Sequence, residues 1–354
     1  MSVTALTEKL DSNTMRTAEY RGATSFAVYS DVPSEFLALL SGCGVYDLGW
    51  RAKIVLTGKD RVRWLNGMVT NNVRDLSVGQ GVYAFLLNPQ GHILGDLYVY
   101  NRGDSLLVDT DQSQLAKLLE IFDHYIIMDN VEVTNISEKL TSIGVAGPKS
   151  RALLIAAGLQ VPELKPLQFA DVAWQQVGLT IVRGENEKRE SYEIWLAPEN
   201  AKQVWEALVN TGAKPVGTTA LDLYRVALGI PKYGQDIRER DLPQETEQTG
   251  ALHFSKGCYI GQEIVERIRS RGNVRRKFTG FLIDGPLPAA GTKIQSAGKD
   301  VGEITSSASL PGAAGERAVA LGYLRREAAM PDKELQAGNA RATVTQLPFE
   351  VIND

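Results

Sequence analysis

The chain has 354 residues and a formal net charge of −4 at pH 7, with 44% hydrophobic and 23% charged residues. This composition is typical of a globular protein with two or three domains, and it excludes a disordered, collagen-like or coiled-coil chain. The slightly acidic charge gives no overall basic field for nucleic acid or an anionic membrane, so any basic function must be local.

The first residues and the cysteine and histidine content restrict the setting of the protein. Residues 1–22 are too polar for a secretory signal, and no later stretch reaches about 18 consecutive apolar residues, so we expect a cytoplasmic protein without a membrane span. Cys43 and Cys258 are too few for a fold held by disulfides. The three histidines lie far apart in the sequence, so we expect no zinc site made by this chain alone.

The first part of the chain alternates between strand and helix patterns, which indicates a mixed α+β fold rather than a doubly wound parallel sheet. The predicted strands are 52–57, 83–87, 92–100 and 105–109, and the predicted helices are 59–67 and about 112–125. A β-turn at Asn88-Pro89-Gln90-Gly91 joins the second and third strands, because these residues favour turns. We therefore expect a ferredoxin-like α+β unit over residues 50–137.

The second part of the chain predicts another α+β unit, formed by residues 1–49 with 138–278. Its predicted strands are 140–145, 179–183 and 192–196, and its predicted helices are 150–157, 201–210 and 219–228. From about residue 279 the chain consists of short alternating segments broken by Gly, Pro and Ser. This pattern predicts a small β-barrel or sandwich over residues 279–354.

The most informative stretch reads Lys256-Gly257-Cys258-Tyr259-Ile260-Gly261-Gln262-Glu263. Apolar residues then recur at helical spacing, which predicts a helix over 261–270 that ends near Gly272. Cys258 would lie just before the N-terminus of this helix, where the helix dipole and the charge of Lys256 would lower the thiol pKa and favour a reactive thiolate. The alternative is a buried cysteine that packs as a small hydrophobic residue, and the spacing alone favours this alternative.

The octapeptide and its surroundings resemble the YgfZ-like folate-binding proteins, which are relatives of the aminomethyltransferase (T-protein) of the glycine cleavage system. The similarity spans nearly the whole chain and includes Gly44-Val45-Tyr46-Asp47, Leu87–Gly91, Leu223–Pro231 and Leu242-Pro243-Gln244-Glu245. It implies an α+β, three-domain folate-binding aminomethyltransferase-like fold, with the domains in a ring around a central folate site and a C-terminal β-barrel.

The resemblance also implies a function. It indicates a tetrahydrofolate-binding factor that supports the assembly or repair of iron–sulfur clusters in other enzymes, including enzymes that modify tRNA. The expected partners are folate and iron–sulfur client enzymes or assembly proteins. Lys256 and Cys258 would carry the chemistry. The other residues of the motif are Gly257, Tyr259, Gly261, Gln262 and Glu263.

The folate contacts that the resemblance implies are Tyr83, Asn88, Glu193, Arg225 and Tyr233. A folate site needs aromatic or apolar walls for the pterin, a few polar groups for its amide edge and cations for the glutamate tail. Each residue also has a structural alternative. Tyr83 could belong to the core of a strand, and Asn88 could simply form the turn. Glu193 could lie on the solvent face of a strand, Arg225 could form a surface ion pair, and Tyr233 could pack in a loop.

The sequence differs from the aminomethyltransferase in the strand after the Asn88 turn. That enzyme has paired aspartates here, the first of which is understood to assist chemistry at the folate nitrogen. The corresponding stretch is Ile93-Leu94-Gly95-Asp96-Leu97, so Gly95 replaces the first acid and only Asp96 remains. Glycine cannot relay a proton. Aminomethyl or other one-carbon transfer is therefore the alternative function.

A local basic segment contrasts with the acidic chain. Residues 267–277 hold six cations and no acid: Arg267, Arg269, Arg271, Arg275, Arg276 and Lys277. A polyglutamate tail, a tRNA-bound partner complex or an acidic partner surface could dock there, whereas the structural alternative is a solvated helix end. Because no aromatic residues alternate with these cations, direct binding of nucleic acid is the least expected of the three functions.

Overall fold

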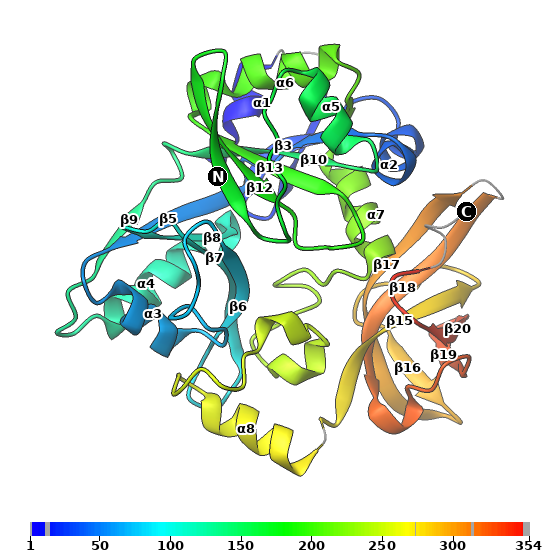
Figure 1. Cartoon of the computed structure of the whole chain (residues 1–354). Coiled ribbons are helices and arrows are strands. Elements are labelled where there is room, and N and C mark those ends of the chain that lie inside the picture. The colour runs from blue at the N-terminus through cyan, green and yellow to red at the C-terminus, as the bar shows by residue number, and fades with distance from the viewer. Residues whose placement is uncertain (1, 11–14, 273, 313–314, 350–354) are drawn as a thin grey trace. The chain divides into compact units, whose positions relative to one another are not determined.

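The computed structural model describes residues 2–10, 15–272, 274–312 and 315–349, and Figure 1 labels its helices and strands. The chain packs into two compact units. Unit 1 comprises residues 1–67, 71–84 and 97–221, and unit 2 comprises residues 68–70, 85–96 and 222–354. The chain therefore passes from one unit to the other five times.

A five-stranded sheet has the strand order β6-β7-β8-β5-β9. Its strands are β5 (Arg51–Thr57), β6 (Gly81–Leu87), β7 (Ile93–Asn101), β8 (Leu106–Asp111) and β9 (Glu132–Asn135), and the helices near them in the sequence are α3 (Arg61–Met68), the 3-10 helix η1 (Gln112–Gln114) and α4 (Leu115–Tyr125). The antiparallel register of β5 and β8 pairs Arg51 with Asp111 and Lys53 with Asp109. Cross-strand partners share a face, so one face of this sheet carries two pairs of opposite charge.

A six-stranded sheet in unit 1 has the order β11-β12-β13-β10-β4-β14. Its strands are β4 (Gly44–Asp47), β10 (Thr141–Ala146), β11 (Phe169–Trp174), β12 (Val177–Arg183), β13 (Ser191–Leu196) and β14 (Lys214–Val216). One face shares a buried apolar cluster with helices α1 (Ala5–Lys9), α5 (Ser150–Ala156) and α6 (Ala201–Asn210). Glu193 pairs with Gly144, and Trp195 with Ser142, in β10. Because Ile194 belongs to the apolar cluster, its neighbours Glu193 and Trp195 point to the opposite face.

The N-terminal segment of unit 1 adds a small three-stranded sheet with the order β1-β3-β2. The elements here are β1 (Ser2–Val3), β2 (Arg16–Tyr20), β3 (Ala23–Val28) and α2 (Val32–Ser41). Asp31 caps α2 by accepting the Ser34 N–H at 2.9 Å. The fully buried Glu35 accepts the Gly217 N–H at 2.8 Å. This bond ties α2 to the start of α7 (Thr218–Leu228).

The C-terminal part of unit 2 is a closed barrel with the order β15-β18-β17-β16-β19-β20 (Figure 1). Its elements are β15 (Arg276–Asp284), β16 (Lys293–Ser296), β17 (Lys299–Gly312), β18 (Gly315–Arg325), the 3-10 helix η5 (Arg326–Ala328), β19 (Glu334–Ala337) and β20 (Ala340–Thr345). Phe281, Ile304 and Leu324 are fully buried in its core. Closure removes the free sheet edges that would otherwise promote aggregation.

The segment between α7 and the barrel contains the octapeptide. It forms the 3-10 helices η3 (Pro243–Thr246) and η4 (Thr249–Ala251) and then α8 (Gln262–Arg271). Gly261 and Gly272 flank α8 in left-handed backbone conformations, with φ of +81° and +89°, which glycine adopts without strain. No helix in the described part of the chain is both long and apolar enough to cross a bilayer.

The structure confirms the predicted mixed α+β fold, the C-terminal barrel, and the helix at 261–270, which is α8. The predicted helix at 59–67 is α3, which begins two residues later. Before residue 50 the sequence predicts no element, although the described residues there contain four strands and two helices. Their strands are short, and β2 is exposed at four of its five positions, so alternation gives little signal. The three-domain division stays a prediction.

Candidate functional site

The turn between β6 and β7 holds Asn88 against the start of α8. Asn88 Oδ1 accepts the His92 N–H at 2.9 Å, and the Gly91 N–H donates to the Asn88 carbonyl at 2.9 Å. A Cβ on Gly91 would lie 2.7 Å from the side chain of Ile264, and a Cβ on Gly261 would lie 2.6 Å from the Asn88 carbonyl oxygen. Only glycine permits this approach. The predicted turn is confirmed, and it packs directly against the end of the octapeptide and the start of α8.

Lys256 anchors the octapeptide loop from within unit 2. Its side chain is 1% exposed, and Nζ donates to the Val69 carbonyl at 2.5 Å. The ammonium also lies 4.9 Å from the centre of the Tyr259 ring, a cation–π arrangement that offsets part of the cost of burying its charge. Burial raises the pKa of Tyr259 to about 12, so its hydroxyl stays protonated at neutral pH. Lys256 therefore fixes the loop.

Cys258 is exposed, whereas Cys43 is buried. The alternative of a buried, packing cysteine is therefore wrong for Cys258. Burial raises the pKa of Cys43 to about 11. Gly257, with φ of +98°, turns the backbone between the buried Lys256 and the exposed Cys258. Activation of the Cys258 thiol by Lys256 and the α8 N-terminus stays a prediction.

Gly95 and Asp96 lie on opposite faces of β7. Along this strand Ile93, Gly95 and Leu97 are buried, and the residues between them are half-buried. A side chain at position 95 would therefore point toward the buried face. Asp96 leaves the strand on the other face, the same one as Tyr98. An acid at position 95 would therefore lie on the opposite face of β7 from Asp96, so Gly95 leaves the face of Asp96 unchanged.

Tyr233 joins the loop after α7 to the start of β7. Its hydroxyl donates to the Leu94 carbonyl at 2.5 Å. Burial, with smaller contributions from the charges of Glu239 and Asp96, raises the pKa of Tyr233 well above its usual value. The Tyr233 hydroxyl is therefore held against β7 at Leu94, two residues before Asp96, a contact that the loop-packing alternative for Tyr233 does not require.

Arg225 is a buried cross-link, which corrects the alternative of a surface ion pair. It is 5% exposed. Nε donates to Asp222 at 2.7 Å and Nη1 donates to the fully buried Asp236 at 2.6 Å. Nη2 donates to Ser306 Oγ in the barrel at 3.1 Å, and Nη1 is also 3.4 Å from the Ile230 carbonyl. A folate carboxylate would have to displace one of these acceptors, so the folate contact of Arg225 stays a prediction.

An aromatic cluster in unit 1 brings Tyr83 and Glu193 into one region. The ring centres of Tyr83 and Tyr98 are 4.9 Å apart, and those of Tyr100 and Trp195 are 4.8 Å apart. Tyr98 and Tyr100 stack with centres 6.4 Å apart. Glu193 accepts the Trp195 Nε1–H at 2.9 Å. Glu193 is half-buried, so its side chain does not simply face solvent.

A buried ionic network that the sequence does not predict lies beside this cluster. Arg51 binds Asp109 and Asp111 at 2.7 and 2.6 Å, Lys53 binds Asp109 at 2.6 Å, and Arg21 binds Asp111 at 2.7 Å. Burial alone would raise the pKa of Asp111, but the charges of Arg21 and Arg51 outweigh it and hold that pKa below its usual range. The signal in the sequence is a charge inside each of the predicted strands 52–57 and 105–109, namely Lys53 and Asp109, with Arg51 and Asp111 just beyond the strand ends.

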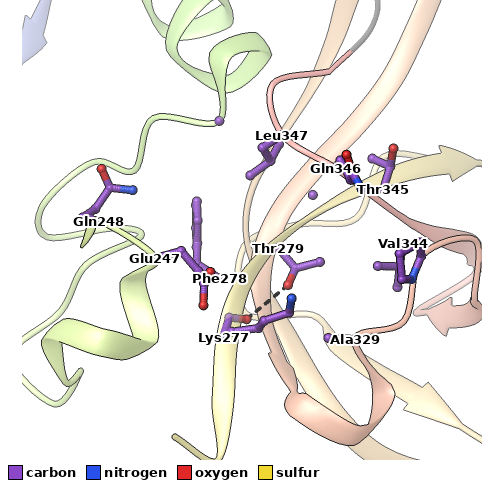
Figure 2. Close-up of a pocket in the computed structure, with 13 residues that line it drawn as sticks. Glu247, Gln248, Lys277, Phe278, Thr279, Ala329, Val344, Thr345, Gln346 and Leu347 are labelled. Atoms are coloured by element: carbon purple, nitrogen blue, oxygen red, sulfur yellow. Dashed lines mark hydrogen bonds between the residues drawn. The ribbon is translucent and has the colours of Figure 1, made fainter. Parts of the chain in front are cut away.

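A cavity of about 400 Å³ lies in unit 2 beside the barrel (Figure 2). The lining includes Lys277, Phe278 and Thr279 of β15, Glu247 and Gln248 of the preceding segment, and Leu347 after β20. Of the residues predicted for the folate and cysteine sites, none is among the described residues that line it. The cavity is thus distinct from the predicted sites.

The basic segment is partly neutralised by contacts outside it. Arg276 binds Asp241 and Glu245 at 2.7 and 3.0 Å. Arg269 lies 3.5 Å from Glu266 and stacks on the ring of Phe254. The side chain of Arg271, and the whole of residue 273, lie outside the described part of the structure. Within the described residues, no group of three or more His, Cys, Asp or Glu side chains is placed to hold a metal ion.

Comparison with known proteins gives two family matches. Residues 3–256 match the GCVT N-terminal domain, and residues 275–349 match the CAF17 C-terminal beta-barrel domain. The aminomethyltransferase of Thermus thermophilus is 28% identical over 339 residues, which cover 94% of this chain and 95% of that protein. The aminomethyltransferase of Rippkaea orientalis is 28% identical over 351 residues, which cover 94% and 92% of the two chains.

A solved structure has the same fold. The glycine cleavage system aminomethyltransferase T from Bartonella henselae superposes with a TM-score of 0.88 and covers 98% of both chains. Its sequence identity is 22%. The whole described chain, barrel included, therefore has an aminomethyltransferase-like fold.

Proposed function

We propose, from the premise that this chain belongs to the GCVT N-terminal domain family, that it binds a tetrahydrofolate and supports the assembly or repair of iron–sulfur clusters in other enzymes. The observation that carries the proposal is the exposed thiol of Cys258, in a loop fixed by the buried Lys256. An exposed thiol on a rigid loop can reach a cluster, a metal or an oxidised group of a partner protein. Tetrahydrofolate, when bound, would supply a carrier for one-carbon groups.

The predicted folate residues offer suitable chemistry in each unit. In unit 1, Tyr83 and Tyr98 provide aromatic surface, and Glu193 provides an acceptor for the amino groups of a pterin. In unit 2, Asn88 Oδ1 is occupied by a backbone N–H, while its Nδ2 group donates to nothing within the described residues and can bind a ligand carbonyl. These groups fit a folate, and Asn88 is the strongest candidate among them.

The test of this function separates folate binding from thiol chemistry. Calorimetric titration should show binding of tetrahydrofolate by the wild-type protein and by Cys258→Ser alike. In cells that lack the native gene, Cys258→Ser should fail to restore iron–sulfur client enzymes, whereas the matched variant Cys43→Ser should restore them. Full restoration by Cys258→Ser would place the function outside the thiol, and absence of folate binding would overturn the proposal.

Aminomethyl transfer is a second candidate, and the orientation of Asp96 favours it. Asp96 points from β7 to the face that carries Tyr98, so an acid is present there despite Gly95. The relatives named aminomethyltransferase are collinear with nearly the whole chain. Tetrahydrofolate-dependent turnover of an aminomethyl carrier at about 1 s⁻¹ or faster, abolished by Asp96→Asn, would establish this function. Absence of turnover would leave the cluster-support function.

A further inference from the structure

A surface hollow in unit 2 is lined mainly by arginines. It measures about 630 Å³ and is lined by Val274, Arg275, Arg325, Arg326 and Glu327. Arg275 precedes β15, and the other two arginines lie where β18 ends and η5 begins. The charged side chains of the lining sum to +2 in a chain whose net charge is −4. The hollow is therefore a local concentration of positive charge.

The register of the barrel strands creates this concentration. Arg276 and Arg325 are direct partners across β15 and β18, an arrangement in which like charges repel. Arg276 avoids the repulsion by binding Asp241 and Glu245 at 2.7 and 3.0 Å. Arg325 has no such carboxylate within the described residues and is exposed.

The other two arginines also keep their charge available. Arg275 is exposed and forms no ion pair with any residue that the structure describes. Arg326 donates Nη1 to the Gly272 carbonyl at 3.0 Å, and its backbone N–H donates to the Arg275 carbonyl at 3.0 Å. These bonds fix the end of β18 against the segment after α8. No carboxylate among the described residues pairs with the Arg326 guanidinium, whose other donors can bind an anion.

We propose that this hollow binds a short chain of closely spaced carboxylates. Guanidinium groups bind carboxylates through paired, charge-assisted hydrogen bonds, and the volume lies within the range of small-ligand sites. Nucleic acid is disfavoured, because no aromatic residue lines the hollow to stack a base. The chemistry fits an oligo-γ-glutamate or a run of Asp and Glu in a protein.

Calorimetric titration of the full chain at low and moderate salt tests this site. The probes are tetra-γ-glutamate and an α-linked tetrapeptide of Asp and Glu, with inorganic phosphate and a short single-stranded DNA as comparison anions. We expect binding of at least one carboxylate probe, weakened by salt. The double variant Arg275→Gln/Arg325→Gln should lower its affinity about 5- to 30-fold. Glu327→Gln should raise the affinity.

The matched control is Arg317→Gln, an exposed arginine of the same strand β18 outside the hollow, which should bind as the wild type does. Preference for the γ-linked or the α-linked probe identifies the source of the carboxylates. No carboxylate binding, tighter binding of phosphate or DNA, or equal loss in Arg317→Gln would overturn the proposal. Because no probe contains a pterin, failure here leaves the proposed folate function untouched.

Discussion

Lys256 and Cys258 are two residues apart but lie in opposite environments. The lysine is buried and bonded to Val69, while the cysteine is exposed. A buried ammonium needs compensating partners, so Lys256 constrains the backbone that carries Cys258. The sequence motif therefore combines an anchor with an accessible thiol.

The two cysteines should differ sharply in reactivity toward a small alkylating agent. At pH 8 a thiol with the raised pKa of Cys43, about 11, is about one part in a thousand thiolate, and burial also blocks access. We expect Cys258 to be modified in the native protein and Cys43 only after unfolding. Mass spectrometry of the intact protein over time measures the number of labels added. As the control, native Cys258→Ser should take up one label fewer than the wild type. Labelling of both cysteines at similar rates would contradict the structure.

Arg225→Ala should destabilise the protein strongly, by about 3–5 kcal/mol, because it leaves the fully buried Asp236 without its cation. Denaturant unfolding measures this loss. The control Arg240→Ala removes an exposed partner of Glu303 and should cost less than about 1 kcal/mol. Weak folate binding in a fully stable Arg225→Ala protein would instead give Arg225 the ligand role that the sequence suggests.

Glu303 should make the stability depend on acid pH. Burial alone would raise the pKa of Glu303, but hydrogen bonds and charge from Lys293 and Arg238 outweigh it and lower that pKa from 4.5 to about 2. The stabilisation is therefore complete above about pH 5 and is lost as the pH falls toward 2. The Tm difference between wild type and Glu303→Gln should shrink over this interval. A constant difference would show that Glu303 acts through packing alone.

At the scale of elements, the close approach of the β6–β7 turn to the start of α8 can be tested at Gly261, with Gly257 as the control. Gly261→Ala should destabilise the protein more than Gly257→Ala. Both residues have positive φ, which costs a side chain about 1–2 kcal/mol, but only the Cβ at 261 would collide with the Asn88 carbonyl. Unfolding free energies compare the two variants. Equal losses would show that the turn and α8 adjust freely to each other.

Helix α8 and the barrel could be predicted because their patterns are local. The apolar spacing after Gly261 and the glycines that flank α8 fix its limits, and short alternating strands are typical of a barrel. The pairing of Arg51 with Asp111 could not be predicted, since it depends on the register of strands that are distant in the chain. The place of Lys256 and Cys258 before a predicted helix already suggests a reactive thiol, but only the resemblance favours that role over packing. The side of β7 that Asp96 occupies became clear only from burial.

At the scale of the whole molecule, tetrahydrofolate should raise the Tm. A ligand at 100 times its Kd adds about 2.7 kcal/mol, and a chain of this length unfolds with an entropy of roughly 0.7 kcal/mol per kelvin, so the shift should be about 4 °C. Differential scanning calorimetry measures it. The Tm of Cys258→Ser should rise by the same amount, because the Cys258 thiol is not expected to bind the pterin. An unchanged Tm of the wild type would argue against a folate site.

The repeated passage of the chain between its two units bears on how it is synthesised. The carbonyl of Val69 can accept its hydrogen bond only after Lys256, 187 residues further along the chain, has been synthesised. The Ile93 N–H likewise lacks its acceptor until the carbonyl of Asp241 has been synthesised. At 5–20 residues per second, a ribosome needs roughly 10–40 s to make the intervening chain. During that time the hairpin that carries Asn88 has left the ribosome without its final partners. Nascent chains stalled before residue 241 should therefore depend on chaperones more than chains released after the barrel is complete.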